Sequence, residues 1–198
     1  MLGGYESGRV PRVDIQGSRA FLLNPSIKRR LKSFTRAADT GAGIGRVTKD
    51  LLSHLFATTD LVEPVFHEEA RSGEFLAEQR AAGRIGEVFG VGLQDWYPQE
   101  HSYNLIWNQW CLGHLEDDDL VEYFKRCKLA VVPDDGVICV KENVCVQTFD
   151  LDNTDSSVTR SDQLFKTIFK RAGLKLVYEA VQHGMPKELY PVKMYALI

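Results

Sequence analysis

Several features that would assign a protein class directly are missing from this sequence. None of its 198 residues belongs to an apolar run of about 18 residues, so no transmembrane helix is predicted. The opening residues, MLGGYESGRVPRVD, lack the apolar core of a secretory signal. The net charge is −3, so the chain has no basic excess. We therefore expect no nucleic-acid partner and no membrane association.

Metal-binding spacings are missing as well. The four cysteines lie 16, 12 and 6 residues apart, at Cys111, Cys127, Cys139 and Cys145. They form no C-x-x-C pair and no zinc spacing, and the five histidines are scattered along the chain. The sequence therefore predicts reduced, mostly buried thiols in an intracellular protein, and no metal site.

The residues that are present predict one α/β domain over 1–198, with 44% of them hydrophobic and 26% charged. Apolar periodicity predicts helices over 17–34, 44–56, 65–82, 116–132 and 161–172. It predicts seven strands, at 36–39, 60–64, 87–92, 103–110, 137–143, 174–182 and 191–198. Residues 144–160 are too polar for a core element, so we expect an insertion there. Strands that alternate with helices indicate a mostly parallel sheet with helices on both faces.

A glycine-rich turn follows the first predicted strand, in the segment ADTGAGIGRVTK. Its glycines occupy every second position, at Gly41, Gly43 and Gly45. A nicotinamide fingerprint would place the third glycine where Arg46 stands, and a P-loop would need Gly-Lys-Ser/Thr. Asp39 precedes the turn, at the end of a strand that is short and polar where an apolar run is expected. The pattern favours a nucleotide site of another kind, with a plain tight turn as the alternative.

Polar residues follow the next strands in order. Glu63 ends the second strand, 24 residues after Asp39, and its carboxylate can accept hydrogen bonds from both hydroxyls of a ribose. The third strand ends in GLQDW and the fourth in NQW. Ligands of parallel sheets bind at the carboxyl ends of strands, so these groups predict a nucleotide site there. The alternative for Glu63 is a solvated strand end.

Six motifs together resemble one family, the α-N-terminal protein methyltransferases. They are DTGAGIGRVTK, VEP, GLQDW, YNLIWNQWCLGHL, ICVKEN and LDNTDSSVTRS, and the resemblance runs over the whole chain. The patterns W-x-Q-W-x-x-G-H-L and D-x-x-D-S-S are its specific parts, and the Glu-Pro pair is similar to fungal members. The resemblance implies a class I, Rossmann-like fold with S-adenosylmethionine as cofactor. It implies methylation of the free α-amino group of proteins that begin Xaa-Pro-Lys/Arg after Met removal, ribosomal proteins among them. It further implies a monomer in the cytoplasm and the nucleus.

The resemblance also implies roles for individual residues. The implied cofactor-binding residues are Gly41, Gly43, Gly45, Arg46, Glu63, Pro64, Leu93, Gln94 and Gln109, with Arg46 facing the cofactor carboxylate. The implied substrate-binding residues are Leu2, Gly3, Trp110, Asn143, Asp152, Asp155, Ser157 and Tyr190. Asp155 and His114 match residues proposed as catalytic bases.

The chemistry of methyl transfer agrees with these roles. The attacking nitrogen must be neutral, and an α-amino group has a pKa of about 7.7–8.0 against about 10.4 for lysine. A carboxylate or an imidazole within reach can accept its proton. We favour Asp155 over His114 because Asp155 lies in the distinctive insertion. Trp110 would form the wall of a proline slot, and Asp152 and Asp155 would attract a basic third residue.

Other interpretations stay open at this point. Trp110 could belong to the core, His114 to a helix start, Asn143 to a strand cap, and the acidic segment to a solvated loop. The enzyme could instead methylate a small-molecule amine. Family members carry a further helical segment before MLGGY, so a form without it would have a wetter site and weak or absent activity. A chain of that kind could bind its ligands without turnover.

Overall fold

The computed structural model describes residues 8–198, so the predicted substrate residues Leu2 and Gly3 lie outside the described part. The main strands are β1 (Arg36–Thr40), β2 (Thr58–Val62), β3 (Ile85–Phe89), β4 (Leu105–Gln109), β5 (Val137–Asn143), β8 (Leu176–Val181) and β9 (Val192–Leu197). The α-helices are α1 (Arg9–Leu22), α2 (Pro25–Lys28), α3 (Arg46–Asp50), α4 (His67–Ser72), α5 (Ala77–Ala81), α6 (Asp117–Ala130) and α7 (Asp162–Arg171). A separate pair of strands, β6 (Phe149–Asp152) and β7 (Ser157–Arg160), forms an antiparallel hairpin.

Seven strands form one sheet in the order β3-β2-β1-β4-β5-β9-β8. Strands β1 to β5 pair in parallel, whereas β9 runs antiparallel to both of its neighbours. The prediction of a seven-stranded, mostly parallel α/β sheet is confirmed. The order of the strands reverses between β1 and β4, and ligands of open α/β sheets bind beside such a reversal, at the carboxyl ends of the strands.

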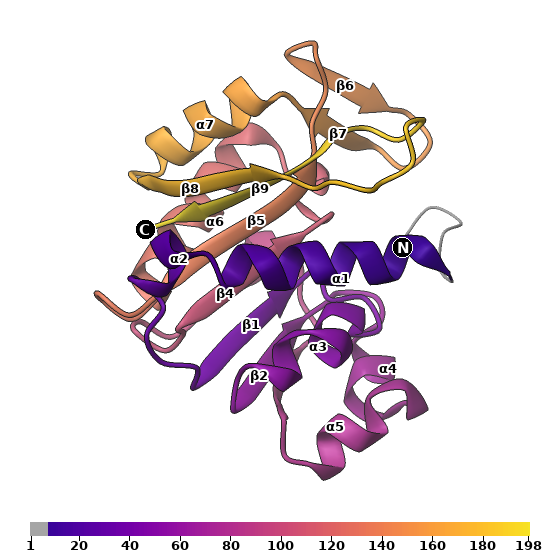
Figure 1. Cartoon of the computed structure of the whole chain (residues 1–198), viewed down its shortest axis with the longest axis vertical. Helices are drawn as coiled ribbons and strands as arrows, with labels where there is room; N and C mark the ends of the chain where they lie inside the picture. The colour runs from indigo at the N-terminus through magenta and orange to yellow at the C-terminus, as the bar shows by residue number, and fades with distance from the viewer. Residues whose placement is uncertain (1–7) are drawn as a thin grey trace.

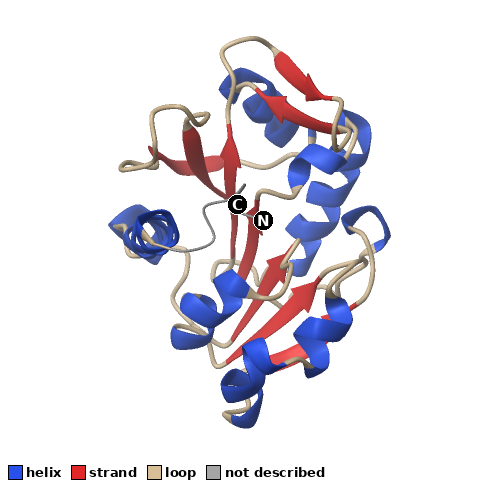
Figure 2. Ribbon diagram, turned by 90° about the vertical axis from the view of Figure 1, so that its right-hand side faces the viewer, coloured by secondary structure: helices blue, strands red, loops and turns tan. Residues whose placement is uncertain are grey.

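Helices cover both faces of the sheet (Figure 1; Figure 2). Trp107 on β4 packs with α1, α2 and the α3 region on one face, whereas Ile106 packs with α6 and α7 on the other. Successive side chains of a strand point to opposite faces, and both faces of β4 are covered by helices. Every residue of β4 is therefore buried, and apolar and polar residues do not alternate along it. A smaller cluster, with Ala70 of α4 and with Phe75 and Leu76 between α4 and α5, packs against β2 and β3.

The polar composition of β1 has a structural reason. Ala37 and Ala38 are fully buried, so the strand does lie in the centre of the sheet. The hydroxyl of Thr40 is buried 2.8 Å from Asn108 Oδ1, and the hydroxyl of Tyr123 donates to the same oxygen at 2.7 Å. These polar side chains pair with one another inside the fold, so β1 needs no run of large apolar residues.

Three predicted helices have different bounds in the structure. The helix expected over 17–34 starts at Arg9 and ends at Leu22, because Asn24 caps a separate turn by accepting from Ser26 N at 2.9 Å. The helix expected over 44–56 leaves α geometry at Leu51. The helix expected over 65–82 breaks at Gly73 into α4 and α5. Predicted strands agree with the observed ones except at their ends.

The predicted insertion contains the β6–β7 hairpin, which stands above the sheet in Figure 1. Arg160 anchors it from β7 with a guanidinium that is almost fully buried. Its Nε donates to Asp117 Oδ1 at 2.7 Å, and its two terminal nitrogens donate to Leu112 O at 2.9 Å and Leu115 O at 2.5 Å. The hairpin is thereby tied to the segment that joins β4 to α6.

Replacing Arg160 with glutamine should lower the free energy of unfolding by about 3 kcal/mol, because three hydrogen bonds of a buried charged group are lost. Urea unfolding measures this change. The matched control is Arg171→Gln, since Arg171 donates to the neighbouring exposed Asp118 at 2.5 Å. That surface pair should contribute less than about 1 kcal/mol. Equal losses in both variants would contradict the anchoring role.

Candidate functional site

The glycine turn lies at the carboxyl ends of β1 and β2. Gly41, Gly43 and Gly45 all have positive φ angles, of 64°, 57° and 91°. A Cβ atom on Gly41 would lie 2.2 Å from Cys111 Cβ, whereas one on Gly43 would meet nothing within 4 Å. The turn therefore packs tightly against β4 at one glycine and faces open space at another, as a backbone that receives a ligand would.

Glu63 holds the outer side of this turn. Its Oε2 accepts from Gly43 N at 2.8 Å, and its Oε1 accepts from Val65 N at 2.8 Å and Phe66 N at 3.3 Å. A carboxylate offers about four acceptor positions, so one remains for a ligand hydroxyl. The neighbouring Pro64 is exposed. The structure thus gives Glu63 a second task, that of fixing the turn, which the sequence did not indicate.

Asp39 secures the helix that follows the turn. Its buried Oδ2 accepts from the backbone N–H of Thr48 at 3.0 Å and from the hydroxyl of Thr48 at 2.7 Å. Burial raises the pKa of Asp39 to about 6, and the two bonds from Thr48 limit this rise. Asp39 is therefore a support of the glycine turn.

Behind the turn lies a buried ionic cluster, which we define as Asp14, Arg46, Gln109 and Lys141. Asp14 Oδ2 lies 2.8 Å from Arg46 Nη1, and Asp14 Oδ1 lies 2.5 Å from Lys141 Nζ. Gln109 Nε2 donates to both carboxylate oxygens, at 3.0 and 3.1 Å, and Gln109 Oε1 accepts from Trp107 at 3.0 Å. The amide of Gln109 is thus held inside the cluster. The structure brings together Arg46 and Gln109, two of the predicted cofactor-binding residues, through their shared partner Asp14.

The sequence reasoning missed Asp14 and Lys141. A signal for each was present. Asp14 lies between Val10 and Ser18 at four-residue spacing on the buried face of α1, and Lys141 interrupts the apolar strand VICVKEN. A charged residue at an apolar position needs a buried partner, and these two are partners of each other.

Trp110 follows β4 with an unusual backbone, its φ being 53°. Its ring centroid lies 5.8 Å from Arg46 Cζ. Its indole Nε1 is buried without a hydrogen-bond partner in the described structure. A positive φ is strained for a bulky residue, and an unpaired buried donor is costly, so both point to a functional position.

The third strand end is fixed through backbone carbonyls. Arg126 Nη2 donates to Leu93 O at 2.9 Å and to Gln94 O at 3.0 Å. Leu93 is buried, whereas the side chain of Gln94 is exposed. Leu93 therefore packs into the core at this strand end, and Gln94 keeps its amide for solvent or a ligand.

The predicted substrate residues lie on and around the hairpin. Asp155 Oδ1 accepts from Ser157 N at 2.9 Å, and Asp152 Oδ1 accepts from Thr154 N at 2.8 Å. The bonds from Ser157, followed by the nearby His114, lower the pKa of Asp155, so its carboxylate is ionised at neutral pH.

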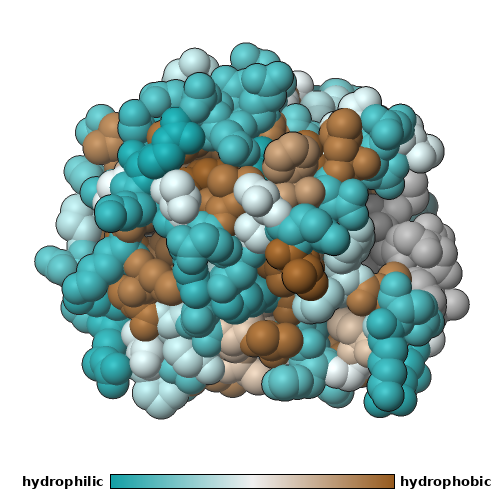
Figure 3. Space-filling view, turned by 90° about the horizontal axis from the view of Figure 1, so that it is seen from above, coloured by the Kyte–Doolittle hydropathy of each residue, from teal (hydrophilic) through white to brown (hydrophobic). Residues whose placement is uncertain are grey.

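Two further predicted residues lie outside this acidic turn. Asn143 is the last residue of β5, and Tyr190 donates its hydroxyl to Asp150 on β6. Apolar side chains of the hairpin are exposed as well, Phe149 at 57% and Leu151 at 50%. Figure 3 looks onto this end of the molecule, where apolar patches lie between polar ones. The surface has the mixed character of one that a peptide could contact.

Glu142 is a buried carboxyl group at the end of β5. Its Oε1 accepts from Cys111 N at 2.8 Å and Leu112 N at 3.0 Å. Burial raises its pKa to about 7, against the opposing effect of these bonds.

This raised pKa predicts a pH-dependent stability. The contribution of Glu142 is fully present below its ordinary pKa of 4.5 and is lost as the pH rises through about 7. The loss is on the order of 3 kcal/mol, and Glu142→Gln should remove it while keeping an acceptor oxygen. Urea unfolding between pH 5 and 8 measures the difference as a flatter curve for the variant. Parallel curves for the two proteins would contradict the prediction.

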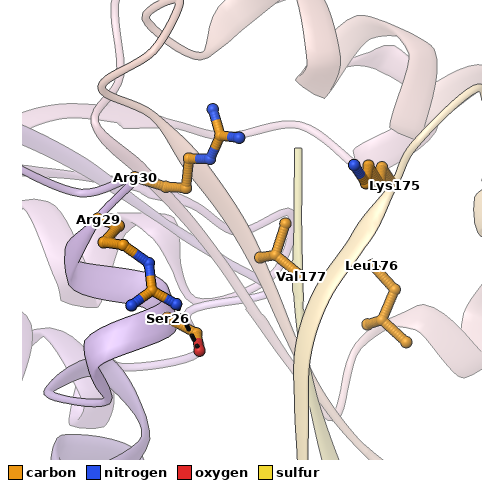
Figure 4. Close-up of a pocket in the computed structure, with 6 residues that line it drawn as sticks. All are labelled: Ser26, Arg29, Arg30, Lys175, Leu176 and Val177. Carbon is orange, nitrogen blue, oxygen red and sulfur yellow. Dashed lines mark hydrogen bonds between the residues drawn. The ribbon is translucent and has the colours of Figure 1, made fainter.

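The hollow in Figure 4 lies elsewhere in the fold. It has a volume of about 490 Å³ and is lined by Ser26, Arg29, Arg30, Lys175, Leu176 and Val177, between α2 and β8. Strand β8 is the edge of the sheet, on the far side of β5 and β9 from the glycine turn. Because the converging polar groups gather at the ends of β1, β2 and β4, we place the candidate site there.

Within residues 8–198, no three His, Cys, Asp or Glu side chains gather as metal ligands would. No helix in this part of the chain combines the length and the apolar character that a membrane span needs.

Comparisons with known proteins match the whole chain. The family model described as AdoMet dependent proline di-methyltransferase covers residues 1–198. An α-N-terminal protein methyltransferase 1 of Schizosaccharomyces pombe is 48% identical over 198 residues, which cover 88% of that relative. An N-terminal Xaa-Pro-Lys N-methyltransferase 1 of Danio rerio is 43% identical over all of this chain and 86% of its own length. A solved SAM-dependent methyltransferase from Leishmania major superposes with a TM-score of 0.84 and 41% identity, over 96% of this chain and 73% of that one.

Proposed function

The chain belongs to the family of AdoMet-dependent proline di-methyltransferases, and on this premise we propose that it methylates the free α-amino group of proteins that begin Xaa-Pro-Lys or Xaa-Pro-Arg. The cofactor of the family is S-adenosylmethionine. One observation carries the choice of substrate. Asp155 on the acidic turn of the hairpin lies within the electrostatic reach of His114, which follows Trp110 in the chain, and the ring of Trp110 lies 5.8 Å from Arg46 Cζ. These contacts support an acidic group and an aromatic ring beside the cofactor.

The residues of the site fit S-adenosylmethionine, which supplies a methyl group on a positively charged sulfur when bound. Glu63 keeps an acceptor position for a ribose hydroxyl. Arg46 contacts Asp14 through Nη1 and its side chain is 21% exposed, so the rest of its guanidinium suits the carboxylate of the cofactor. The open space beside Gly43 leaves room for the chain between ribose and carboxylate. Leu93 and Gln94 would border the adenine.

The acidic turn would receive the substrate amine. Asp155 is ionised, so it attracts the ammonium form of the N-terminus and then accepts or relays its proton. His114 lies close enough to influence Asp155 and offers the alternative route for that proton. Trp110 would pack against the proline of the substrate, whose fixed φ reduces the entropy lost on binding. Asp152, with Asn143, Ser157 and Tyr190 around it, would bind the following residues.

The remaining parts of the proposal rest on the family resemblance. We propose ribosomal proteins among the substrates, one domain over 1–198, a monomeric enzyme, and work in the cytoplasm and the nucleus without a nucleic-acid partner. An exposed acidic turn supports protein substrates over a small enclosed amine, because it leaves room for a chain that continues past its third residue.

Mass spectrometry of a peptide that begins Ser-Pro-Lys-Arg tests the proposal. The chain and S-adenosylmethionine should add one or more methyl groups to the free peptide and none to an N-acetylated copy. A gain on both peptides would mean that a side chain is methylated, and a gain on neither would overturn the proposal. Cofactor binding measured by calorimetry on the same preparation separates an inactive site from an unfolded one.

A further inference from the structure

The buried ionic cluster does more than hold α1 on the sheet. It contains two cations, Arg46 and Lys141, and among residues 8–198 one carboxylate contacts them directly, that of Asp14. The side chains of Asp14 and Lys141 are fully buried, whereas that of Arg46 is 21% exposed. The cation that reaches solvent, and so a ligand, is therefore Arg46.

The ammonium of Lys141 has no donor left for a ligand. Besides Asp14 Oδ1, it lies 2.9 Å from the backbone oxygen of Asp14, 2.9 Å from Ser18 Oγ and 2.8 Å from Gln182 Oε1. Gln182 is held in turn, since its Nε2 donates to Val13 O and His183 O. Three ammonium hydrogens face four acceptors, so Lys141 can act on a ligand only through its charge.

The carboxylate of Asp14 contacts both cations. Its contact with Lys141 is the shorter, at 2.5 Å against 2.8 Å to Arg46, and Arg46 Nη1 lacks the alignment of a hydrogen bond to it. Burial lowers the pKa of Lys141, and the carboxylate of Asp14 raises it again. Asp39 is a further carboxylate within the field of Arg46, but its hydrogen bonds come from Thr48. The two cations and the one carboxylate that contacts them therefore leave the cluster with a net charge of one positive unit. Arg46 presents this charge to the site, because it is the exposed cation.

We propose that Lys141 is a positioning residue that sets cofactor specificity, because it neutralises Asp14 and so leaves Arg46 free to bind the carboxylate of the cofactor. This inference rests on the proposed function. The expected consequence is selection against decarboxylated S-adenosylmethionine, which has the same transferable methyl group but no carboxylate. Such a ligand would leave the excess positive charge of the cluster without a second carboxylate, which is unfavourable. Without Lys141, Asp14 would pair fully with Arg46, and the two ligands would bind alike.

Calorimetry with two non-reactive ligands tests this assignment. They are S-adenosylhomocysteine and its decarboxylated analogue, which differ only in the carboxylate. The wild-type chain should bind the first about 10- to 100-fold more tightly, as one charge-assisted contact provides. Lys141→Met should reduce this ratio to about threefold or less, mainly by weakening S-adenosylhomocysteine, while the analogue binds nearly as before. A purely structural role would weaken both ligands equally.

Two further variants keep the test decisive. Lys141→Gln removes the same charge but retains hydrogen bonding, so it replaces the methionine variant if that one does not fold. Ser18→Ala removes one contact of Lys141 without changing any charge, and it should keep the wild-type ratio. A ratio near one in the wild-type chain, or an unchanged ratio in a folded Lys141 variant, would overturn the inference alone. Failure of both ligands to bind the folded wild-type chain would overturn the proposed function as well.

Discussion

Replacing Glu63 with alanine is expected to weaken S-adenosylmethionine binding by about 100-fold or more. The carboxylate has two tasks at once. It accepts from Gly43 N and Val65 N, which shapes the glycine turn, and it offers its remaining acceptor position to a ribose hydroxyl. Each hydrogen bond to a charged group contributes about 1.5–3 kcal/mol. The variant loses both the ribose contact and the shape of the turn, so its binding free energy should fall by more than one such bond contributes.

Calorimetric titration of the variant with S-adenosylhomocysteine measures this loss. The matched control is Glu78→Ala, since Glu78 is an exposed acid on α5. The control should bind as the wild-type chain does. Because Glu63 fixes backbone donors, the variant should also show faster amide exchange at Gly43 and Val65. An unchanged dissociation constant would remove Glu63 from the cofactor site.

Most of the fold could be predicted from the sequence, for identifiable reasons. Glycines at 41, 43 and 45 and the acid at 63 could be located because they follow or end predicted strands, and parallel strands bring their ends together. The strand β4 was predicted from apolar residues alone, since it is buried on both faces. Features that depend on one element at a time were thus visible in one-dimensional patterns.

Features that depend on distant partners were not visible. Asp14 is 127 residues from Lys141, and their pairing follows only once α1 lies across β5. The start of α1 at Arg9 was hidden for the same reason, because Asp14 and Ser18 read as polar interruptions of an apolar face. The segment of the hairpin was predicted only as an insertion, because β6 is exposed, both strands are short and polar, and the anchor Arg160 binds carbonyls of another segment. Glu63 was predicted as a ligand for ribose but not as the acceptor of a hydrogen bond from Gly43 N. Every residue type except proline has a backbone N–H, so a sequence does not show which of them a carboxylate binds.

The second large effect is expected at the substrate amine. Asp155→Asn should lower kcat for a Ser-Pro-Lys-Arg peptide by about 100- to 1,000-fold, the range that one proton-transferring group contributes. Asp152→Asn should instead raise KM and leave kcat nearly unchanged, because its proposed partner is the basic third residue. Asp118→Asn, an exposed acid on α6, is the control and should change neither value. Steady-state kinetics with varied peptide separates the three variants, and cofactor binding should stay the same in all of them.

The pH dependence of kcat/KM, together with the kinetics of two variants, then distinguishes two roles of Asp155, attracting the ammonium and accepting its proton. The amine must lose its proton, so the rate should rise with pH through about 7.7–8.0, where a free α-amino group titrates. The pKa of Asp155 is lowered, so this carboxylate is ionised throughout that window and contributes no inflection of its own. Both Asp155→Asn and His114→Asn should keep the rise, because it belongs to the amine. If Asp155 chiefly attracts the ammonium and His114 takes the proton, His114→Asn should lower kcat, and Asp155→Asn should mainly raise KM for the peptide. A kcat that falls in Asp155→Asn and stays near the wild-type value in His114→Asn would make the carboxylate the acceptor, because the loss would then follow the carboxylate and not the imidazole.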